Sequence, residues 1–295
     1  MIKQTLFFAS PASLSLKYNQ LVIRRAEGEE TITRPIEDIG FVIVENQQVH
    51  LTVPLLNALA EQNVSVIFCN GRSMPCSMLM PLESNVVQQE VYRYQVECSK
   101  PNQKRIWKEI VTSKIRNQAA LLHRLGKDGD ELKPHYSNVL SGDTTNREGA
   151  AARLYWQQLF GPGFSRQREG ATPNDLLNYG YTILRAAVAR ALLGSGLYPA
   201  FGLFHRNRYN AFPLADDVME PYRPFVDEVV YALYQSNPQI ALTATVKQRL
   251  VQVLHADVQL NKQVHPLQIA LTYTSASLVK ALKDKDAHLR IPTFV

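Results

Sequence analysis

The residues whose side chains are best suited to catalysis or metal binding lie in one short stretch of the chain. Residues 205–224 contain one histidine, three carboxylic acids, three arginines and three prolines. Pro213 is predicted to begin a helix, because the first residue of a helix needs no hydrogen-bonded amide. This helix places Asp217 and Glu220, three positions apart, on one face. The two prolines that follow Glu220 each remove a backbone donor, which indicates a turn shaped to form a site.

A second candidate carboxylate lies far upstream, near the start of another predicted helix. Glu148 follows Thr145-Asn-Arg and precedes a run of alanines. With His205 and Glu220 it makes a set of two carboxylates and one imidazole, carried by distant segments. Such a set suits a hard divalent ion, Mg²⁺ or Mn²⁺, and the imidazole favours Mn²⁺.

Each member of this set also has an ordinary structural explanation. Thr145 and Glu148 fit the spacing of a capping box, which would stabilise a helix start by about 1 kcal/mol. His205 taken alone fits a hydrogen-bonded structural histidine. The acids of the central stretch could pair with its arginines on a wet surface, where such pairs contribute about 0–1 kcal/mol. Spacing alone leaves both interpretations open.

Two motifs carry a resemblance to a known family. They read Asn146-x-Glu148-Gly-x-Ala-Ala-Arg-x-Tyr155 and, after His205, Asp217-x-x-Glu220-Pro-x-Arg223-Pro. Together they resemble the CRISPR-associated spacer-acquisition integrases, the universal metal-dependent DNA endonuclease family of CRISPR adaptation, over most of the chain. Many members have aspartate where this chain has Glu220. The glutamate still offers an oxygen ligand. With glutamate at this position, the chain resembles the branch of the family that accompanies single-protein RNA-guided effector nucleases.

The resemblance implies a catalytic set and a reaction. It implies that Glu148, His205 and Glu220 hold Mg²⁺ or Mn²⁺ and that Asp217 is a further catalytic residue. Such an ion polarises a scissile phosphate, and the attacker is then water for cleavage or a DNA 3′-hydroxyl for strand joining. The implied function is insertion of foreign DNA fragments as new spacers into a CRISPR array. The implied assembly is a homodimer with a small ferredoxin-like companion protein of CRISPR adaptation.

The basic residues are concentrated in the same part of the chain as the candidate site. Residues 1–80 hold 6 Lys+Arg against 7 Asp+Glu, whereas the whole chain holds 32 against 26. A surplus of this kind favours a polyanion as partner, because phosphate neutralisation releases counterions. The candidate DNA contacts are Lys104, Arg105, Lys108, Lys114, Arg116, Arg147 and Arg223. An ordinary solvated helix face, and internal salt bridges for Arg147 and Arg223, are the alternatives.

The hydrophobic pattern predicts an α+β chain of two domains. A small β-rich association domain is expected over residues 1–80 and a larger all-α catalytic domain over 81–295, with a linker near 72–84. In the first domain, strands are predicted over 4–10, 13–17, 21–26, 31–34, 36–44 and 64–69, and a helix over 54–62. In the second, helices are predicted over 86–98, 102–125, 148–160, 172–193, 213–220, 225–234, 245–254 and 266–282. A hairpin is expected at 258–264, and residues 133–144 are expected to be irregular.

The cellular setting predicted is the cytoplasm. The chain has no apolar run of the roughly 20 residues that span a bilayer, and its first residues lack the pattern of a secretion signal. Cys69, Cys76 and Cys98 are too few for a disulfide framework and have no zinc-type spacing, which indicates reduced thiols.

Two other functions fit parts of the sequence. A non-catalytic DNA-binding scaffold would use the basic surface and keep the acid cluster for structure. A metal phosphohydrolase for small nucleotides is disfavoured, because the chain has no His-Asp dipeptide, phosphate-binding glycine-lysine loop or His-Glu-x-x-His motif.

Overall fold

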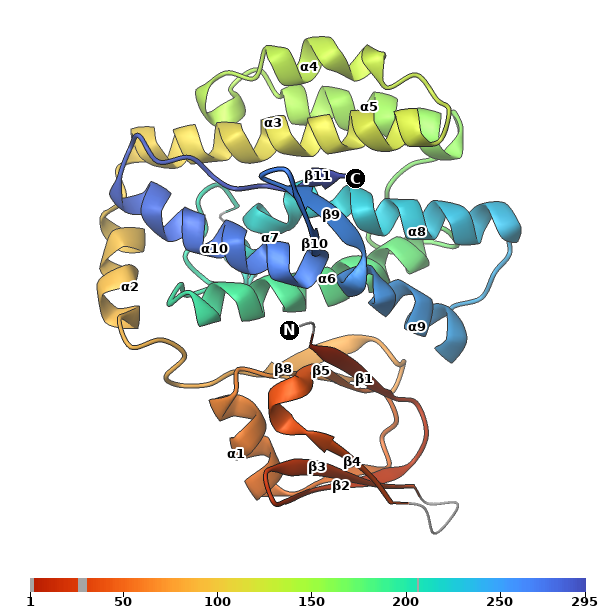
Figure 1. Cartoon of the computed structure of the whole chain (residues 1–295). Coiled ribbons are helices and arrows are strands. Elements are labelled where there is room, and N and C mark those ends of the chain that lie inside the picture. Colours follow the sequence, from red (N-terminus) through yellow and green to blue (C-terminus); the bar gives the residue numbers. More distant parts are fainter. Residues whose placement is uncertain (1–2, 26–30, 206) are drawn as a thin grey trace. The chain divides into compact units, whose positions relative to one another are not determined.

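The computed structural model describes residues 3–25, 31–205 and 207–295 (Figure 1). The chain divides into two compact units, Met1–Val86 and Val87–Val295. Strands dominate the first unit and helices the second, which confirms the predicted α+β class.

In the described part of the first unit, the strands form two four-stranded sheets. One sheet has the order β1 (Gln4–Phe8), β5 (Ile39–Val44), β7 (Ser65–Cys69), β8 (Pro75–Leu79), with β1, β5 and β7 mutually parallel. The other has the order β4 (Thr31–Pro35), β3 (Gln20–Arg25), β2 (Ala12–Lys17), β6 (Val49–Leu51). The hairpin between β2 and β3 turns at Tyr18 and Asn19, whose φ angles of 50° and 58° fit a tight primed turn.

Apolar side chains from both sheets and one helix make the core of this unit. Helix α1 (Val53–Glu61) buries Leu55 and Leu59, one helical turn apart, in a cluster with Leu14, Val42 and Val66. The predicted strands and helix are therefore present. Two short strands were missed, β6 and β8, and β8 lies in the segment predicted as a linker. β8 lies at the edge of its sheet and is only partly buried, so its sequence lacks a hydrophobic alternation.

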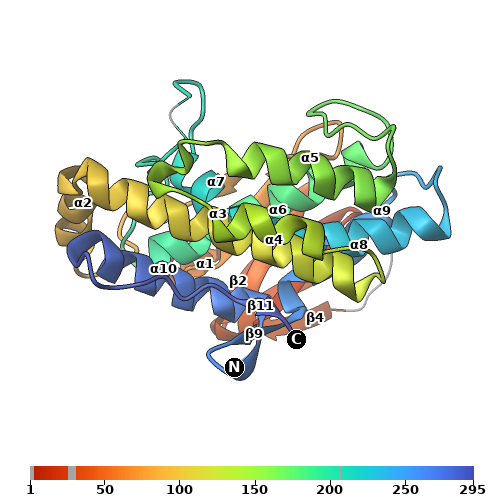
Figure 2. The same cartoon turned by 90° about the horizontal axis from the view of Figure 1, so that it is seen from above.

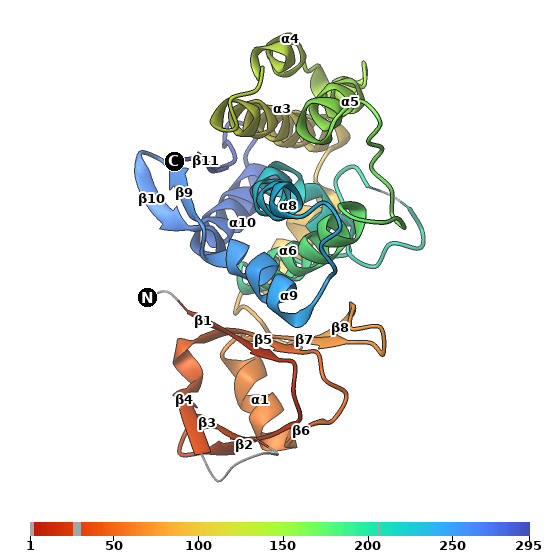
Figure 3. The ribbon, with the colours of Figure 1, turned by 90° about the vertical axis from the view of Figure 1, so that its right-hand side faces the viewer.

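The second unit is built mainly from helices (Figures 1 and 2). They are α2 (Gln88–Glu97), α3 (Lys100–Arg124), α4 (Lys133–Ser137), α5 (Arg147–Phe160), α6 (Asn174–Gly194), α7 (Pro213–Met219), α8 (Arg223–Ser236), α9 (Ala244–Val251) and α10 (Leu267–Lys283). Figures 1 and 3 show α3, α4 and α5 as a layer that lies over α8 and α10, with α6 on the other side.

Helix α6 packs against α7, α8, α9 and α10. Most of its side chains are buried, as its nearly continuous apolar sequence predicts. At Gly180 it approaches α8 so closely that a Cβ atom would lie 2.5 Å from Cγ1 of Val226. This packing sets the position of α8, and α8 begins directly after the acids of the central stretch.

The C-terminal segment docks on the chain's own surface. The predicted hairpin is present as β9 (Asp257–Leu260) and β10 (Gln263–Pro266), and β11 (Thr293–Phe294) pairs with β9 to make a three-stranded sheet. The ring of Phe294 stacks on Phe225 of α8 at a centroid distance of 4.3 Å. This unit was predicted to be all-α apart from one hairpin, and it also contains a three-stranded sheet. Residues 133–144, expected to be irregular, contain α4, whose five residues are too few to give a periodic pattern.

Within the described residues, no helix is both long enough and apolar enough to span a bilayer.

Candidate metal centre

Asp217 holds the imidazole of His205 in a fixed orientation. The carboxylate, in α7, is fully buried and accepts the amide protons of Leu203, Phe204 and His205 at 2.6–3.1 Å. It also contacts Nδ1 of His205 at 2.7 Å. A proton on Nδ1 that is donated to Asp217 leaves the lone pair on Nε2, the atom that a metal ion would bind.

Stacked rings hold the His205 loop against α3. Phe204 lies parallel to Trp107 at a centroid distance of 4.3 Å, and the His205 ring meets Trp107 edge to face at 5.7 Å. The hydrogen bond to Asp217 raises the pKa of His205 against the effect of burial, and the charges of Asp217 and Glu220 raise it further. The imidazole thus lies within electrostatic range of Glu220.

Glu220 is presented to α3 by the short 3-10 turn Glu220–Tyr222. The amide side chain of Asn117, on α3, donates to the carbonyl oxygen of Pro221 at 2.8 Å and anchors this turn. The side chain of Glu220 is 4% exposed, and Nε of Arg223 lies 2.9 Å from its Oε1. Burial alone would raise the pKa of Glu220, but the charges of Arg223 and Lys114 lower it to about 2. This carboxylate is therefore ionised at neutral pH.

Lys114 of α3 joins the two candidate carboxylates. Its Nζ lies 2.6 Å from Oε1 of Glu148 and 2.5 Å from Oε2 of Glu220. Two oxygens at these distances from one nitrogen are at most about 5 Å apart, so α5 and the Glu220 turn converge at one point on α3. Burial lowers the pKa of Lys114, but the charges of Glu220 and Glu148 more than offset this and raise it.

The start of α5 directs Glu148 to this point. The carboxylate of Asp143 accepts the amide protons of Arg147 and Glu148 at 2.8 and 3.0 Å, and Asn146, the N-cap residue, accepts that of Gly149 at 3.2 Å. These groups satisfy the amides of the first turn. The N-cap residue is Asn146, and the amide of Glu148 donates to Asp143 and not to Thr145. The carboxylate of Glu148 contacts Lys114, so the capping-box interpretation of Thr145 and Glu148 is wrong.

A divalent ion fits the chemistry of this donor set. Two carboxylates and an imidazole are suitable ligands, and one oxygen each of Glu148 and Glu220 already faces a single positive charge, the ammonium group of Lys114. With the side chains where they are, however, no three His, Cys, Asp or Glu residues among those described are grouped to hold a metal. The ammonium group of Lys114 lies between the carboxylates, in the place where an ion would contact both.

A cavity of about 520 Å³ opens beside the imidazole. Its lining includes His205 and Gly202, the side chains of Gln95 and Val96 from α2, and Arg208 from the loop before α7.

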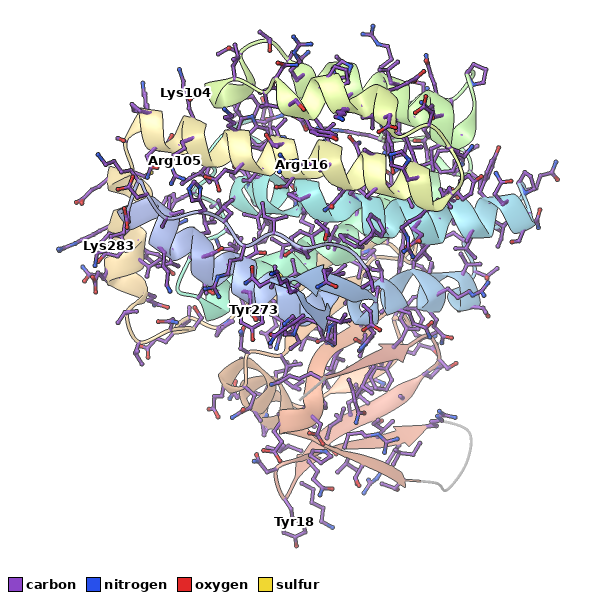
Figure 4. The ribbon with its side chains drawn as sticks, turned by 45° about the horizontal axis from the view of Figure 1, so that its top comes forward. Tyr18, Lys104, Arg105, Arg116, Tyr273 and Lys283 are labelled. Atoms are coloured by element: carbon purple, nitrogen blue, oxygen red, sulfur yellow. The ribbon has the colours of Figure 1, made fainter. Side chains whose placement is uncertain are left out.

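The seven residues predicted to contact DNA have different surroundings. Lys104, Lys108 and Arg116 are exposed on α3, and Figure 4 labels two of them there. Arg105 is held by Glu109 at 2.6 Å and by the carbonyl oxygen of Ala287 at 2.9 Å.

The other three predicted DNA contacts lie closer to the carboxylates. Lys114 bridges Glu148 and Glu220 as described, and Arg223 pairs with Glu220. Arg147, the first residue of α5, is half-buried. Arg206, a partner weighed for the acids of the central stretch, lies outside the described residues. Asp216 pairs instead with Arg185, at 2.9 Å.

A buried carboxylate that sequence analysis missed links the helices behind the site. Asp227 of α8 accepts a hydrogen bond from the hydroxyl of Tyr155 at 2.7 Å and another from that of Tyr181. Burial raises its pKa to about 6, although both tyrosines and Arg223 counteract this. Tyr155 follows Glu148 by seven residues on α5. Its place in the Asn146 motif was the one sequence feature that could have pointed to this buried carboxylate.

A model of the family "CRISPR associated protein Cas1" matches residues 6–256. The chain belongs to this family. Over 296 residues it is 39% identical to the CRISPR-associated endonuclease Cas1 of Neisseria meningitidis serogroup C (strain 8013), covering 99% of this chain and 96% of that protein. A Cas1 endonuclease of Pyrobaculum aerophilum is 30% identical over 248 residues, covering 76% of this chain and 80% of the relative.

Solved structures share the Cas1 fold. A casposase bound to integration product superposes with a TM-score of 0.78 at 20% identity, covering 98% of this chain and 93% of that one. A Cas1 protein from Thermotoga maritima gives a TM-score of 0.75 at 18% identity, with 97% and 99% covered. The family resemblance indicated by the two motifs is therefore confirmed, and it extends over nearly the whole chain.

Proposed function

We propose that this member of the Cas1 family is a DNA endonuclease and integrase that inserts foreign DNA fragments into a CRISPR array as new spacers. The observation that carries the proposal is the meeting of Glu148 and Glu220 at one cation, Lys114, together with an imidazole that Asp217 fixes and that the charge of Glu220 reaches. The N. meningitidis relative, 39% identical over nearly the full length of both chains, is named a Cas1 endonuclease, which supports the same activity.

The proposed cofactor is Mg²⁺ or Mn²⁺, held by Glu148, His205 and Glu220. When bound, such an ion supplies positive charge to the scissile phosphate and promotes loss of a proton from the attacking oxygen. Asp217 keeps the His205 ring in its ligating tautomer, and Arg223 keeps Glu220 ionised. Both roles prepare the ligands before DNA arrives.

DNA is the proposed substrate and binds along α3. Lys104, Lys108 and Arg116 are exposed and lie on the helix that also carries Lys114. Lysine and arginine side chains of this kind hold phosphates without reading sequence. Arg147, half-buried at the start of α5, is a further candidate for a phosphate near Glu148.

The proposed assembly is a homodimer that works with a small ferredoxin-like companion protein in the cytoplasm. One solved structure with this fold is described as a Cas6-RT-Cas1–Cas2 complex; it has a TM-score of 0.72 and covers 97% of this chain and 36% of the other. That protein assembles with Cas2, which supports a companion for this chain as well.

Nicking and strand joining of labelled DNA test the proposal. We expect both products with Mn²⁺ or Mg²⁺ and neither with a chelator. Glu148→Ala, His205→Ala and Glu220→Ala should each remove activity while DNA binding persists, because the substituted groups bind the ion and not the DNA backbone. His50→Ala, at an exposed position of β6, is the matched control. Wild-type activity in any of the three variants would exclude that residue from the mechanism.

The alternative is a non-catalytic DNA-binding scaffold. It is favoured by one observation: Lys114 and Arg223 neutralise Glu148 and Glu220, as in a purely structural cluster. This alternative predicts salt-sensitive DNA binding that is independent of metal, and no cleavage or joining product under any condition.

A further inference from the structure

We propose that Lys114 is an internal counter-ion of the metal centre, which takes the position of the divalent ion in the metal-free protein and must leave it when the ion binds. The inference rests on the proposed metal-dependent function. It assigns a role to a residue whose position in α3 suggested only a contact with DNA.

The distances around Nζ support an exchange of one cation for another. Nζ lies 2.5–2.6 Å from one oxygen of each glutamate, whereas Mg²⁺ binds oxygen at about 2.0–2.1 Å. Each carboxylate therefore needs to move only about half an ångström toward an ion at the same point. Three separate segments, α3, α5 and the turn at Glu220, already supply the frame.

The ammonium and the ion cannot share this place. The side chain of Lys114 is 11% exposed and that of Glu220 only 4%, so water screens their charges weakly. Two cations in contact with the same carboxylates would repel each other strongly in these surroundings. Lysine suits an exchange, because its charge sits on a flexible four-carbon stem and can move without the backbone.

The charges of the cluster explain why a counter-ion is needed. Glu148 and Glu220 carry two negative charges, and Lys114 and Arg223 carry two positive charges. The metal-free cluster is therefore neutral, which prevents repulsion between the two carboxylates. When a divalent ion replaces the ammonium, the stem keeps the displaced charge nearby and the cluster becomes positive, which complements a DNA phosphate.

Lys114→Met tests this, because methionine keeps much of the stem and removes the charge. We measure Mn²⁺ affinity by titration calorimetry, and Tm in chelator and in Mn²⁺. The variant should bind Mn²⁺ at least about tenfold more tightly than the wild type, because no cation has to be displaced. It should melt below the wild type in chelator and show a larger rise in Tm with Mn²⁺. Lys100→Met, exposed on the same helix, should change neither property.

The outcomes separate the inference from the proposed function. If the wild type binds Mn²⁺ and Lys114→Met binds it no more tightly, the counter-ion role is wrong and the metal site stands. If neither protein binds Mn²⁺, both proposals fail. Should Lys114→Met not fold in chelator, refolding in Mn²⁺ must restore the native circular dichroism spectrum, and failure to do so overturns the inference.

Discussion

Nδ1 of His205 contacts the carboxylate of Asp217 at 2.7 Å, and that carboxylate also accepts three backbone amide protons of the loop that carries the histidine. One buried acid therefore fixes both the ring and the backbone of the candidate ligand. This arrangement makes Asp217 a positioning residue for His205, and at the proposed metal site it would act on the ion through that ring.

Asp217→Asn should weaken Mn²⁺ binding about 10–100-fold, the range typical for the loss of a group that orients a metal ligand. Asparagine keeps one acceptor oxygen, so the loop should still fold, with a lower Tm. Titration calorimetry and thermal unfolding measure the two effects. Asp216→Asn is the matched control, because the carboxylate of Asp216 pairs with Arg185 and accepts a hydrogen bond from Asn210. Equal Mn²⁺ affinity in all three proteins would contradict the prediction.

Asp143→Ala should destabilise the start of α5 and displace Glu148. The substitution leaves the amides of Arg147 and Glu148 without their acceptor, which costs about 0.5–2 kcal/mol of unfolding free energy. Urea denaturation measures this loss, and Mn²⁺ titration reports the displacement of Glu148. Thr145→Ala is the control and should change the unfolding free energy by less than about 0.5 kcal/mol, because Asn146 is the N-cap residue. A larger loss of unfolding free energy for Thr145→Ala would show that Thr145 caps the helix and would contradict the prediction.

Replacing Lys104, Lys108 and Arg116 together by glutamine should weaken DNA binding and its dependence on salt. Each phosphate contact that is lost reduces the slope of log K against log [salt] by about 0.9. Fluorescence anisotropy at several salt concentrations measures the slope. Arg105→Gln should instead leave the slope unchanged and lower the Tm, because Glu109 and the backbone at Ala287 hold its guanidinium group. An unchanged slope in the triple variant would place the DNA elsewhere.

Asp227 should make the protein more stable as the pH falls from 7 to 4.5. Burial raises the pKa of its carboxyl from 3.8 to about 6, so the folded state binds this proton more tightly than the unfolded chain does. Asp227 alone should therefore add about 2 kcal/mol to the free energy of unfolding over this range. In Asp227→Asn, which keeps an acceptor for one tyrosine, this part of the pH dependence should disappear.

Urea denaturation at several pH values tests this difference. The range ends at pH 4.5, because Glu220 has the opposite effect on stability below this pH. Its pKa is lowered from 4.5 to about 2, so its contribution to the free energy of unfolding is present above pH 4.5 and is lost as the pH falls toward about 2. Parallel pH profiles for the wild type and Asp227→Asn would show that Asp227 does not titrate in this range.

The long elements could be predicted from the sequence because their patterns are local. Helix α6 is apolar nearly all round, and Pro213 begins α7 as its missing amide proton predicts. The turn signals near Tyr18 and Asn261 mark hairpins that the structure contains. The short elements β6, β8 and α4 were missed, since three to five residues carry too little periodicity to be distinguished from a loop.

The sequence by itself determined which residue types are available for chemistry and, through the two motifs, the family. It could not determine the position of Lys114, which shares α3 with the exposed Lys104 and Lys108 and has the same side chain. Only the packing of α5 and of the Glu220 turn against α3 brings two carboxylates to Lys114 and leaves the other two lysines in water. That contact joins segments far apart in the chain, so no local pattern could encode it.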